Sequence, residues 1–240
     1  PLYREALDLR RAALPPGHPH IASSLNNLAG VLRETGHFAK VEPLVLEALD
    51  IWRAALPPGH LDIALGLNNL ASVLEDTDRY AEAEPLYREA LDLRRAALPP
   101  GHIDIASSLN NLAGLLKATG RYAEAEPLYR QALNLQRAAL QPGHPTIGTS
   151  LNNFALFLYA TGRYAEAELL WREALDLRRA SLPASHPAIG ISLSNLAGLL
   201  MATCRYAEAE PLYREALDLR RAALPPGHPT IAASLNNLAD

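Results

Sequence analysis

The sequence predicts an all-α fold, an α-solenoid in which antiparallel helix pairs stack one on the next. The first observation is a period of 42 residues, because the segment at residues 120–126 returns at residues 162–168. The second is internal identity, since residues 79–102 recur letter for letter at residues 205–228. The third is that each unit holds two helical patterns. A unit of this size cannot bury its apolar face alone, so consecutive units must stack into a superhelix.

The first helix of the unit at residues 103–140 is predicted from apolar residues at helical spacing, namely Ile105, Leu109, Leu112, Ala113 and Leu116. Thr119 and Gly120 follow, and glycine suits the left-handed residue that ends many helices. The second helix is predicted from one apolar face formed by Ala125, Leu128, Tyr129, Ala132, Leu135, Ala139 and Leu140. Pro142 and Gly143 close it. Arginine pairs such as Arg94 and Arg95 are expected on a solvated helix face, among acidic residues.

The repeat register predicts a single array over residues 1–240. Residues 1–18 form a partial repeat with a second helix only, complete repeats follow at 19–60, 61–102, 103–144, 145–186 and 187–228, and residues 229–240 form a partial first helix. We expect this array to be a fragment of a longer one. Its uncapped ends predict either fraying or head-to-tail self-association, because repeat arrays usually carry polar caps.

Composition limits the partners. The chain has 22 basic and 26 acidic residues, a net charge of -4, spread evenly over the repeats. Nucleic acid and anionic membranes are therefore not expected partners. Apolar stretches fall short of the roughly 18 residues that span a bilayer. A single cysteine, Cys204, excludes an intrachain disulfide and fits a reducing compartment, so we expect a cytoplasmic location.

The unit resembles the tetratricopeptide (TPR) pattern in the residues Leu109, Leu112, Ala113, Leu116, Gly120, Tyr122, Ala125 and Ala132. It departs from that pattern in its length, which exceeds the about 34 residues typical of the family, and in Arg137, where a proline often ends the second helix. The longer unit, with its Asn-Asn-Leu-Ala element and His-Pro loop, resembles the kinesin light chain type of TPR. The resemblance implies a right-handed superhelix and an interaction module that holds peptides or partner domains in a concave groove.

The candidate site lies on the first helices, opposite their apolar face. The polar and small residues there include asparagine pairs, namely Asn26 and Asn27, Asn68 and Asn69, Asn110 and Asn111, Asn152 and Asn153, and Asn236 and Asn237, with Ser194 and Asn195 as the exception. An amide both donates and accepts, so a column of amides suits the backbone of an extended peptide. The family resemblance points to the second asparagine of each pair as a peptide contact. The alternative is that these amides join neighbouring helices or stay solvated.

Selectivity is expected from positions on this face that vary between repeats. The register of Lys117 also carries Arg33, Glu75, Tyr159 and Met201. Tyr159 and Met201, together with Leu156 and Ile191, indicate an apolar anchor pocket in the second half of the array. This pocket would take an aromatic or aliphatic side chain of the partner. The alternative is neutral drift after duplication, since variation alone does not establish contact.

A histidine recurs in every loop, at His18, His60, His102, His144, His186 and His228. We expect these residues to cap helices or shape loops, because stacked repeats place equivalent atoms about 10 Å apart, too far for shared metal ligation. Cys204 and Asp78 occupy the helix-ending glycine register, where a left-handed backbone strains a side chain. Trp52 and Trp171 are expected to pack. No metal site or cofactor is predicted.

No phosphate loop, nucleophile elbow or metal-ligand cluster is present, so the chain is not predicted to be an enzyme. The sequence favours a non-enzymatic scaffold that binds extended peptide or partner-protein segments in a concave groove. The partner's identity is unknown. The alternative is a structural spacer or self-associating rod that stacks through its ends.

Overall fold

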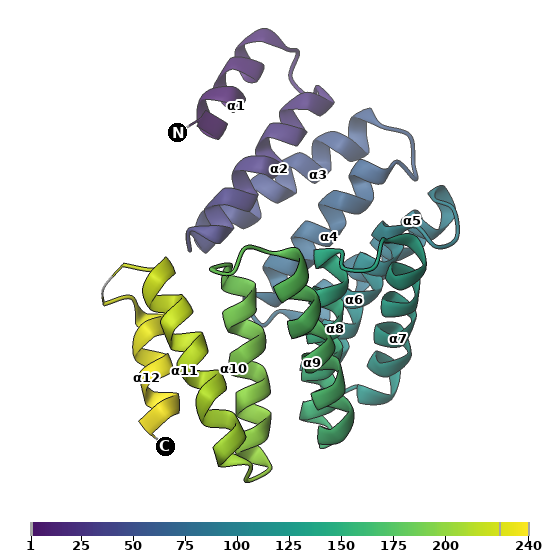
Figure 1. Cartoon of the computed structure of the whole chain (residues 1–240). Coiled ribbons are helices and arrows are strands. Elements are labelled where there is room, and N and C mark those ends of the chain that lie inside the picture. The colour runs from purple at the N-terminus through teal and green to yellow at the C-terminus, as the bar shows by residue number, and fades with distance from the viewer. Residues whose placement is uncertain (1, 226, 240) are drawn as a thin grey trace. The chain divides into compact units, whose positions relative to one another are not determined.

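The structure is a computed structural model that describes residues 2–225 and 227–239, and within these ranges helices joined by short loops are the only regular secondary structure (Figure 1). The residues Pro1 and Asp240, which bound the predicted array, lie outside the described ranges. The helices are α1 (Leu2–Ala13), α2 (Pro19–Glu34), the 3-10 helix η1 (Phe38–Lys40), α3 (Val41–Ala55), α4 (Leu61–Glu75), α5 (Tyr80–Ala97), α6 (Ile103–Ala118), α7 (Tyr122–Ala139), α8 (Pro145–Ala160), α9 (Tyr164–Ser181), α10 (Pro187–Ala202), α11 (Tyr206–Ala223) and α12 (Pro229–Ala239).

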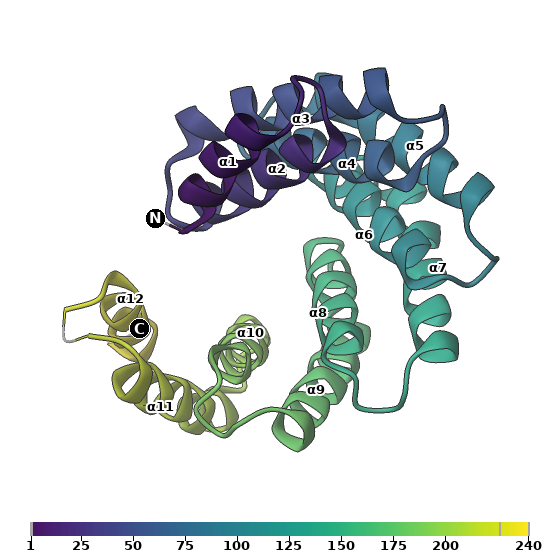
Figure 2. The ribbon, with the colours of Figure 1, turned by 90° about the horizontal axis from the view of Figure 1, so that it is seen from above.

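The chain forms two compact units, one up to Arg121 and one from Tyr122 onward. Within each unit every helix packs against the next helix of the chain, from α1 to α6 in the first and from α7 to α12 in the second. Figure 2 shows α10 beside α11 as an example of such a pair. The predicted all-α architecture of consecutive helix pairs is confirmed.

The glycine that ends the first helix adopts the predicted left-handed backbone. Its φ is 75° at Gly120 and 76° at Gly162. Two non-glycine residues occupy the same register with φ of 58°, namely Asp78 and Cys204. The predicted left-handed backbone at these two positions is confirmed, and this region is unfavourable for a residue with a Cβ.

The loop histidines cap the first helices, as predicted. The Nδ1 atom of His102 accepts a hydrogen bond from the backbone N–H of Asp104 at 3.2 Å. The same bond forms at five further histidines, namely His18, His60, His144, His186 and His228. Each bond satisfies one backbone N–H that the first turn of a helix leaves without an intrahelical partner.

The second helices bury a wider stripe than predicted. In α7, Leu133 and Gln136 are buried although they lie outside the apolar face predicted from the sequence. Ala139, which was predicted to lie on that face, is exposed. The solvated position predicted for Arg94 is wrong, because this side chain in α5 is only 8% exposed. The reason is that α5 packs on both α4 and α6, so its contact surface extends around the helix beyond a single stripe.

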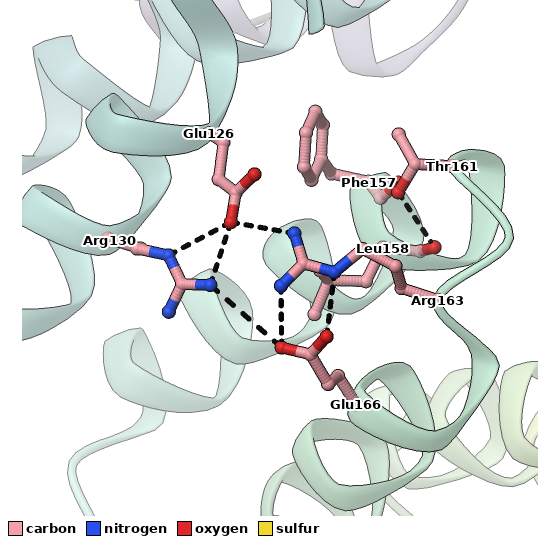
Figure 3. A network of polar contacts seen from close by, with 7 residues as sticks. All are labelled: Glu126, Arg130, Phe157, Leu158, Thr161, Arg163 and Glu166. Atoms are coloured by element: carbon pink, nitrogen blue, oxygen red, sulfur yellow. Dashed lines mark hydrogen bonds and ion pairs between the residues drawn. The ribbon is translucent and has the colours of Figure 1, made fainter. Parts of the chain in front are cut away.

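Arginines at the start of second helices link one hairpin to the previous one (Figure 3). Arg163 donates from Nη1 to Glu126 at 2.7 Å and from Nη2 to Glu166 at 2.6 Å, and Arg130 also bonds Glu126. Hydrogen bonds from Arg163 and Arg130 lower the pKa of Glu126. Pairs at the same spacing of 37 residues form at Arg79 and Glu42, Arg121 and Glu84, and Arg205 and Glu168. Exposed pairs of this kind contribute little to stability, because water and salt screen the two charges.

Candidate functional site

The asparagines of the first helices bond from one repeat to the next. Asn69 donates from Nδ2 to Oδ1 of Asn26 at 2.6 Å, and Asn111 donates in the same way to Asn68 at 2.9 Å. In the second unit Asn195 donates to Asn152 at 2.8 Å. The second asparagine of a pair therefore donates to the first asparagine of the preceding repeat. We call the surface that carries these pairs the asparagine face.

These bonds hold neighbouring first helices together and leave part of each amide unused. Asn69 and Asn111 are half-buried, and each spends one N–H, which leaves its Oδ1 and a second N–H. Asn27 is exposed, and Asn153 is half-buried. Asn152 is buried, and its Oδ1 also accepts a hydrogen bond from the indole N–H of Trp171 at 3.2 Å. Asn110 is half-buried.

Charged residues occupy the variable register of the first unit. Arg33 forms a two-pronged bond with Asp76, from Nε at 2.5 Å and from Nη2 at 3.0 Å. Glu75 accepts a hydrogen bond from the hydroxyl of Tyr87 at 2.9 Å. Burial raises the pKa of Glu75, because desolvation penalises the carboxylate more than its neighbours stabilise it. Lys117 is half-buried in the same register.

Aromatic and apolar residues occupy that register in the second unit. The ring of Tyr159 lies 5.3 Å from the ring of Tyr164 and 5.8 Å from that of Trp171, measured between centroids. Leu156 is half-buried one turn earlier on α8. Met201 and Ile191 line different hollows of α10, the first beside Tyr206, Tyr213 and Glu210 and the second beside Leu219, Ala223 and Leu224. These two candidates are therefore not brought to one place.

An open pocket of about 330 Å³ lies on the asparagine face of the first unit. Asn26, Asn27 and Asn69 line it together with Tyr3, Gly30, Arg33 and Glu34. Its floor is apolar and consists of Val41, Val45 and Val73, of which the most exposed is only 4% accessible. The pocket thus combines buried aliphatic surface with amide and guanidinium groups at its rim, which is the usual composition of a site for an organic side chain.

Buried arginines form a second set of links between repeats, which the sequence analysis missed. Arg94 donates to the hydroxyl of Ser108 at 2.6 Å and to the carbonyl of Asp104 at 3.2 Å. Arg178 makes the same pair of bonds to Ser192 and Ala188. The sequence signal is an arginine followed 14 residues later by a serine, a spacing that joins a second helix to the next first helix.

The described part of the chain contains no group of three or more His, Cys, Asp and Glu side chains placed to hold a metal ion. None of its helices combines the length and apolar character required to cross a bilayer.

Sequence models of the tetratricopeptide repeat match most of the chain. One model matches residues 42–96, 62–138, 104–180 and 188–240, and a second model of the same description matches residues 21–62. No curated protein matches the chain.

Solved structures of repeat proteins share the fold. A kinesin-light-chain-like protein of Podosopora anserina with nearly identical TPR-like repeats is 23% identical, with a TM-score of 0.69 over 86% of this chain and 98% of that chain. BtubC (BKLC) from P. vanneervenii is 21% identical, with a TM-score of 0.73 over 94% of this chain and 90% of that one.

A Rap protein complexed with competence and sporulation factor is 15% identical, with a TM-score of 0.75 over 90% of this chain and 57% of that one. These structural likenesses concern the fold alone, and the sequence models decide the family. The 42-residue helical hairpins and the matches that extend across most of them show that the chain belongs to the tetratricopeptide repeat family.

Proposed function

We propose that this chain is a non-enzymatic scaffold that binds an extended segment of a partner protein along its asparagine face. TPR repeats generally bind protein partners and are typically not enzymes. The observation that carries the proposal is the amide capacity left over on this face. After bonding the preceding repeat, Asn69 and Asn111 each retain an acceptor and a donor. These are the groups that an extended backbone pairs with.

The open pocket beside Asn69 supports the same reading, because it adds apolar surface to the amide row. Backbone pairing supplies affinity for any sequence, while a pocket discriminates between side chains. The similar Rap structure was determined with a bound factor, which fits a binding role for this helical architecture. The single cysteine fits a reducing compartment, so the scaffold is proposed to function in the cytoplasm.

The test is selection from a random peptide display library on the wild-type chain, followed by binding to a variant with Asn69→Ala and Asn111→Ala. We expect the enriched peptides to bind the variant about tenfold or more weakly, because two backbone contacts are lost. The matched control carries Asn68→Ala. This change removes the Asn111–Asn68 hydrogen bond from the acceptor side and spares Asn26, which lines the pocket.

The two variants separate direct contact from repeat stacking. If the amides contact the peptide, the control retains most of the binding that the first variant loses. Equal losses in both variants would assign the effect to stacking and contradict direct contact. No enrichment on folded wild-type chain would favour the other function, a structural spacer or self-associating rod. Circular dichroism of each variant establishes that the helices are intact.

A further inference from the structure

The second helices carry an aromatic residue at one register, and one hairpin lacks it. The residues are Tyr3, Tyr87, Tyr129, Trp171 and Tyr213; the last four are at most 8% exposed, whereas Tyr3 of α1 is 49% exposed. In α3 the same register holds Val45, which is 1% exposed. The hairpin of α2 and α3 is therefore built without the ring that the hairpins of α4 with α5 and of α10 with α11 enclose.

The ring of the other hairpins reaches a defined place on the first helix. The hydroxyl of Tyr87 donates to Glu75 at 2.9 Å. The hydroxyl of Tyr213 lies 3.4 Å from the place that a Cβ on Gly198 would occupy. One period of 42 residues or its multiples relates Glu75 to Arg33 and Gly198 to Gly30. The tip of a ring in the α2 and α3 hairpin would thus lie beside Gly30 and Arg33.

The open pocket lies beside the place of the missing ring. Val45, Gly30 and Arg33 all line it, as do Val41, Val73, Tyr3 and Glu34. A Cβ built on Gly30 meets no atom within 4 Å, so this side of the hairpin is empty. The pocket volume of about 330 Å³ is at the lower end of the range for sites that take organic ligands.

The rim carries a donor and an acceptor, which suits a phenolic hydroxyl at the tip of a ring. Glu75 accepts a hydrogen bond from the hydroxyl of Tyr87, whereas Arg33 in its register can only donate, and Glu34 beside it can accept. Asp76 engages Nε and Nη2 of Arg33, and among the described residues no hydrogen bond is formed by Nη1. A guanidinium held in this way presents a fixed donor to a phenolic oxygen.

We propose that the α2 and α3 hairpin binds a tyrosine side chain of the partner segment, which fills the place that other hairpins fill with their own aromatic residue. The inference rests on the proposed function and adds the chemical identity of the anchor. The ring lies beside Tyr3 and above Val41, Val45 and Val73, and the phenolic oxygen accepts a hydrogen bond from Arg33. Asn69 on the same pocket wall holds the backbone that carries the tyrosine.

The experiment uses p-cresol as a probe and follows the valine methyl signals of the whole chain by NMR. We expect saturable shifts at Val41, Val45 and Val73 in the wild type. Val45→Tyr supplies the missing ring internally and should weaken p-cresol binding at least about tenfold. The matched control is Leu46→Tyr, which places the same ring on the neighbouring exposed residue of α3 and should leave binding unchanged.

A second variant guards against misfolding of the first. Gly30→Leu narrows the pocket from the first helix, and leucine is the residue that α8 carries in this register as Leu156. It should also abolish the shifts. Absence of wild-type shifts at these methyls, or equal binding by folded Val45→Tyr or Gly30→Leu, would overturn the inference.

The peptide experiment distinguishes this inference from the proposed function. Enriched peptides that contain tyrosine and lose affinity for Val45→Tyr support both. Enriched peptides without an aromatic residue that bind Val45→Tyr as well as wild type would overturn the anchor and leave the asparagine face in place. Binding of p-cresol without any peptide enrichment would support the pocket and count against the extended-segment function.

Discussion

Trp52 packs directly against the backbone of Gly66, so closely that a Cβ on this glycine would lie 3.1 Å from its Cε3 atom. The two residues stand 14 positions apart, the spacing at which Arg94 faces Ser108 in the next interface. One interface between repeats is thus closed by a large ring over a glycine and another by a buried hydrogen bond. The two positions differ together between these interfaces: tryptophan occurs with glycine, and arginine occurs with serine. A serine in place of Gly66 would collide with the indole of Trp52.

The paired exchange predicts that Gly66→Ser destabilises the fold. The new Cβ would lie 3.1 Å from both Leu49 Cδ1 and Trp52 Cε3, and overpacking of this kind costs about 1 to 3 kcal/mol. The free energy of unfolding in urea measures the effect. The control is Gly190→Ala in α10, where the nearest atom to a Cβ is 4.0 Å away. This change should stabilise by about 0.5 to 1 kcal/mol, and a loss as large as that of Gly66→Ser would contradict the packing argument.

Removing the hydroxyl that faces Arg94 should destabilise the other kind of interface. Ser108→Ala leaves a buried guanidinium short of one acceptor, at a cost of about 1 to 3 kcal/mol in unfolding free energy. The control, Ser107→Ala, removes a hydroxyl that bonds only the carbonyl of Ile103 within the same helix and should have little effect. The double variant with Arg94→Met should recover most of the loss, because it removes the uncompensated charge. Similar values for the two serines would argue against this role for Arg94.

Cys204→Gly should raise the thermal midpoint. The backbone of Cys204 has a φ of 58°, and a glycine there avoids a steric penalty of about 1 to 2 kcal/mol, partly offset by its greater freedom in the unfolded chain. The reverse change at the equivalent position, Gly162→Ala, should lower the midpoint, because its φ is 76°. Differential scanning calorimetry of both variants checks the pair, and a shift of the same sign in both would exclude backbone strain as the cause.

Glu75→Gln should stabilise the fold at neutral pH. Burial raises the pKa of Glu75 above its unfolded value, so the folded state loses stability as pH rises through the unfolded pKa toward the folded one. Asp76 strengthens the shift, while Arg33 and Lys117 oppose it. Glutamine keeps the acceptor for Tyr87 and carries no charge. Urea unfolding should show a gain of a few tenths of a kcal/mol at pH 7 that vanishes below about pH 4. A less stable variant at pH 7 would contradict the shift.

Local features were predictable from the sequence because they depend on neighbouring residues only. Gly120 ends a helix and His102 caps one through contacts two to four residues away. The burial of Arg94 was not predictable in this way, because a helical wheel assumes one buried stripe and α5 has two packing partners. On the candidate site, the sequence identified which face Asn69 and Asn111 share. Their bonds to Asn26 and Asn68 depend on the offset of 43 residues that stacking creates.

The Arg–Glu pairs between consecutive hairpins allow the number of 42-residue repeats in the array to change without loss of the pairing. Arg79 needs the glutamate 37 positions earlier, and Arg121, Arg163 and Arg205 need the same. Deleting or duplicating 42 residues returns every arginine to a glutamate at that distance, whereas any other insertion inside a unit separates the two charges. Recombination between the identical segments at residues 79–102 and 205–228 preserves this spacing. The ladder thereby makes the array tolerant of gene-level expansion and contraction by whole repeats.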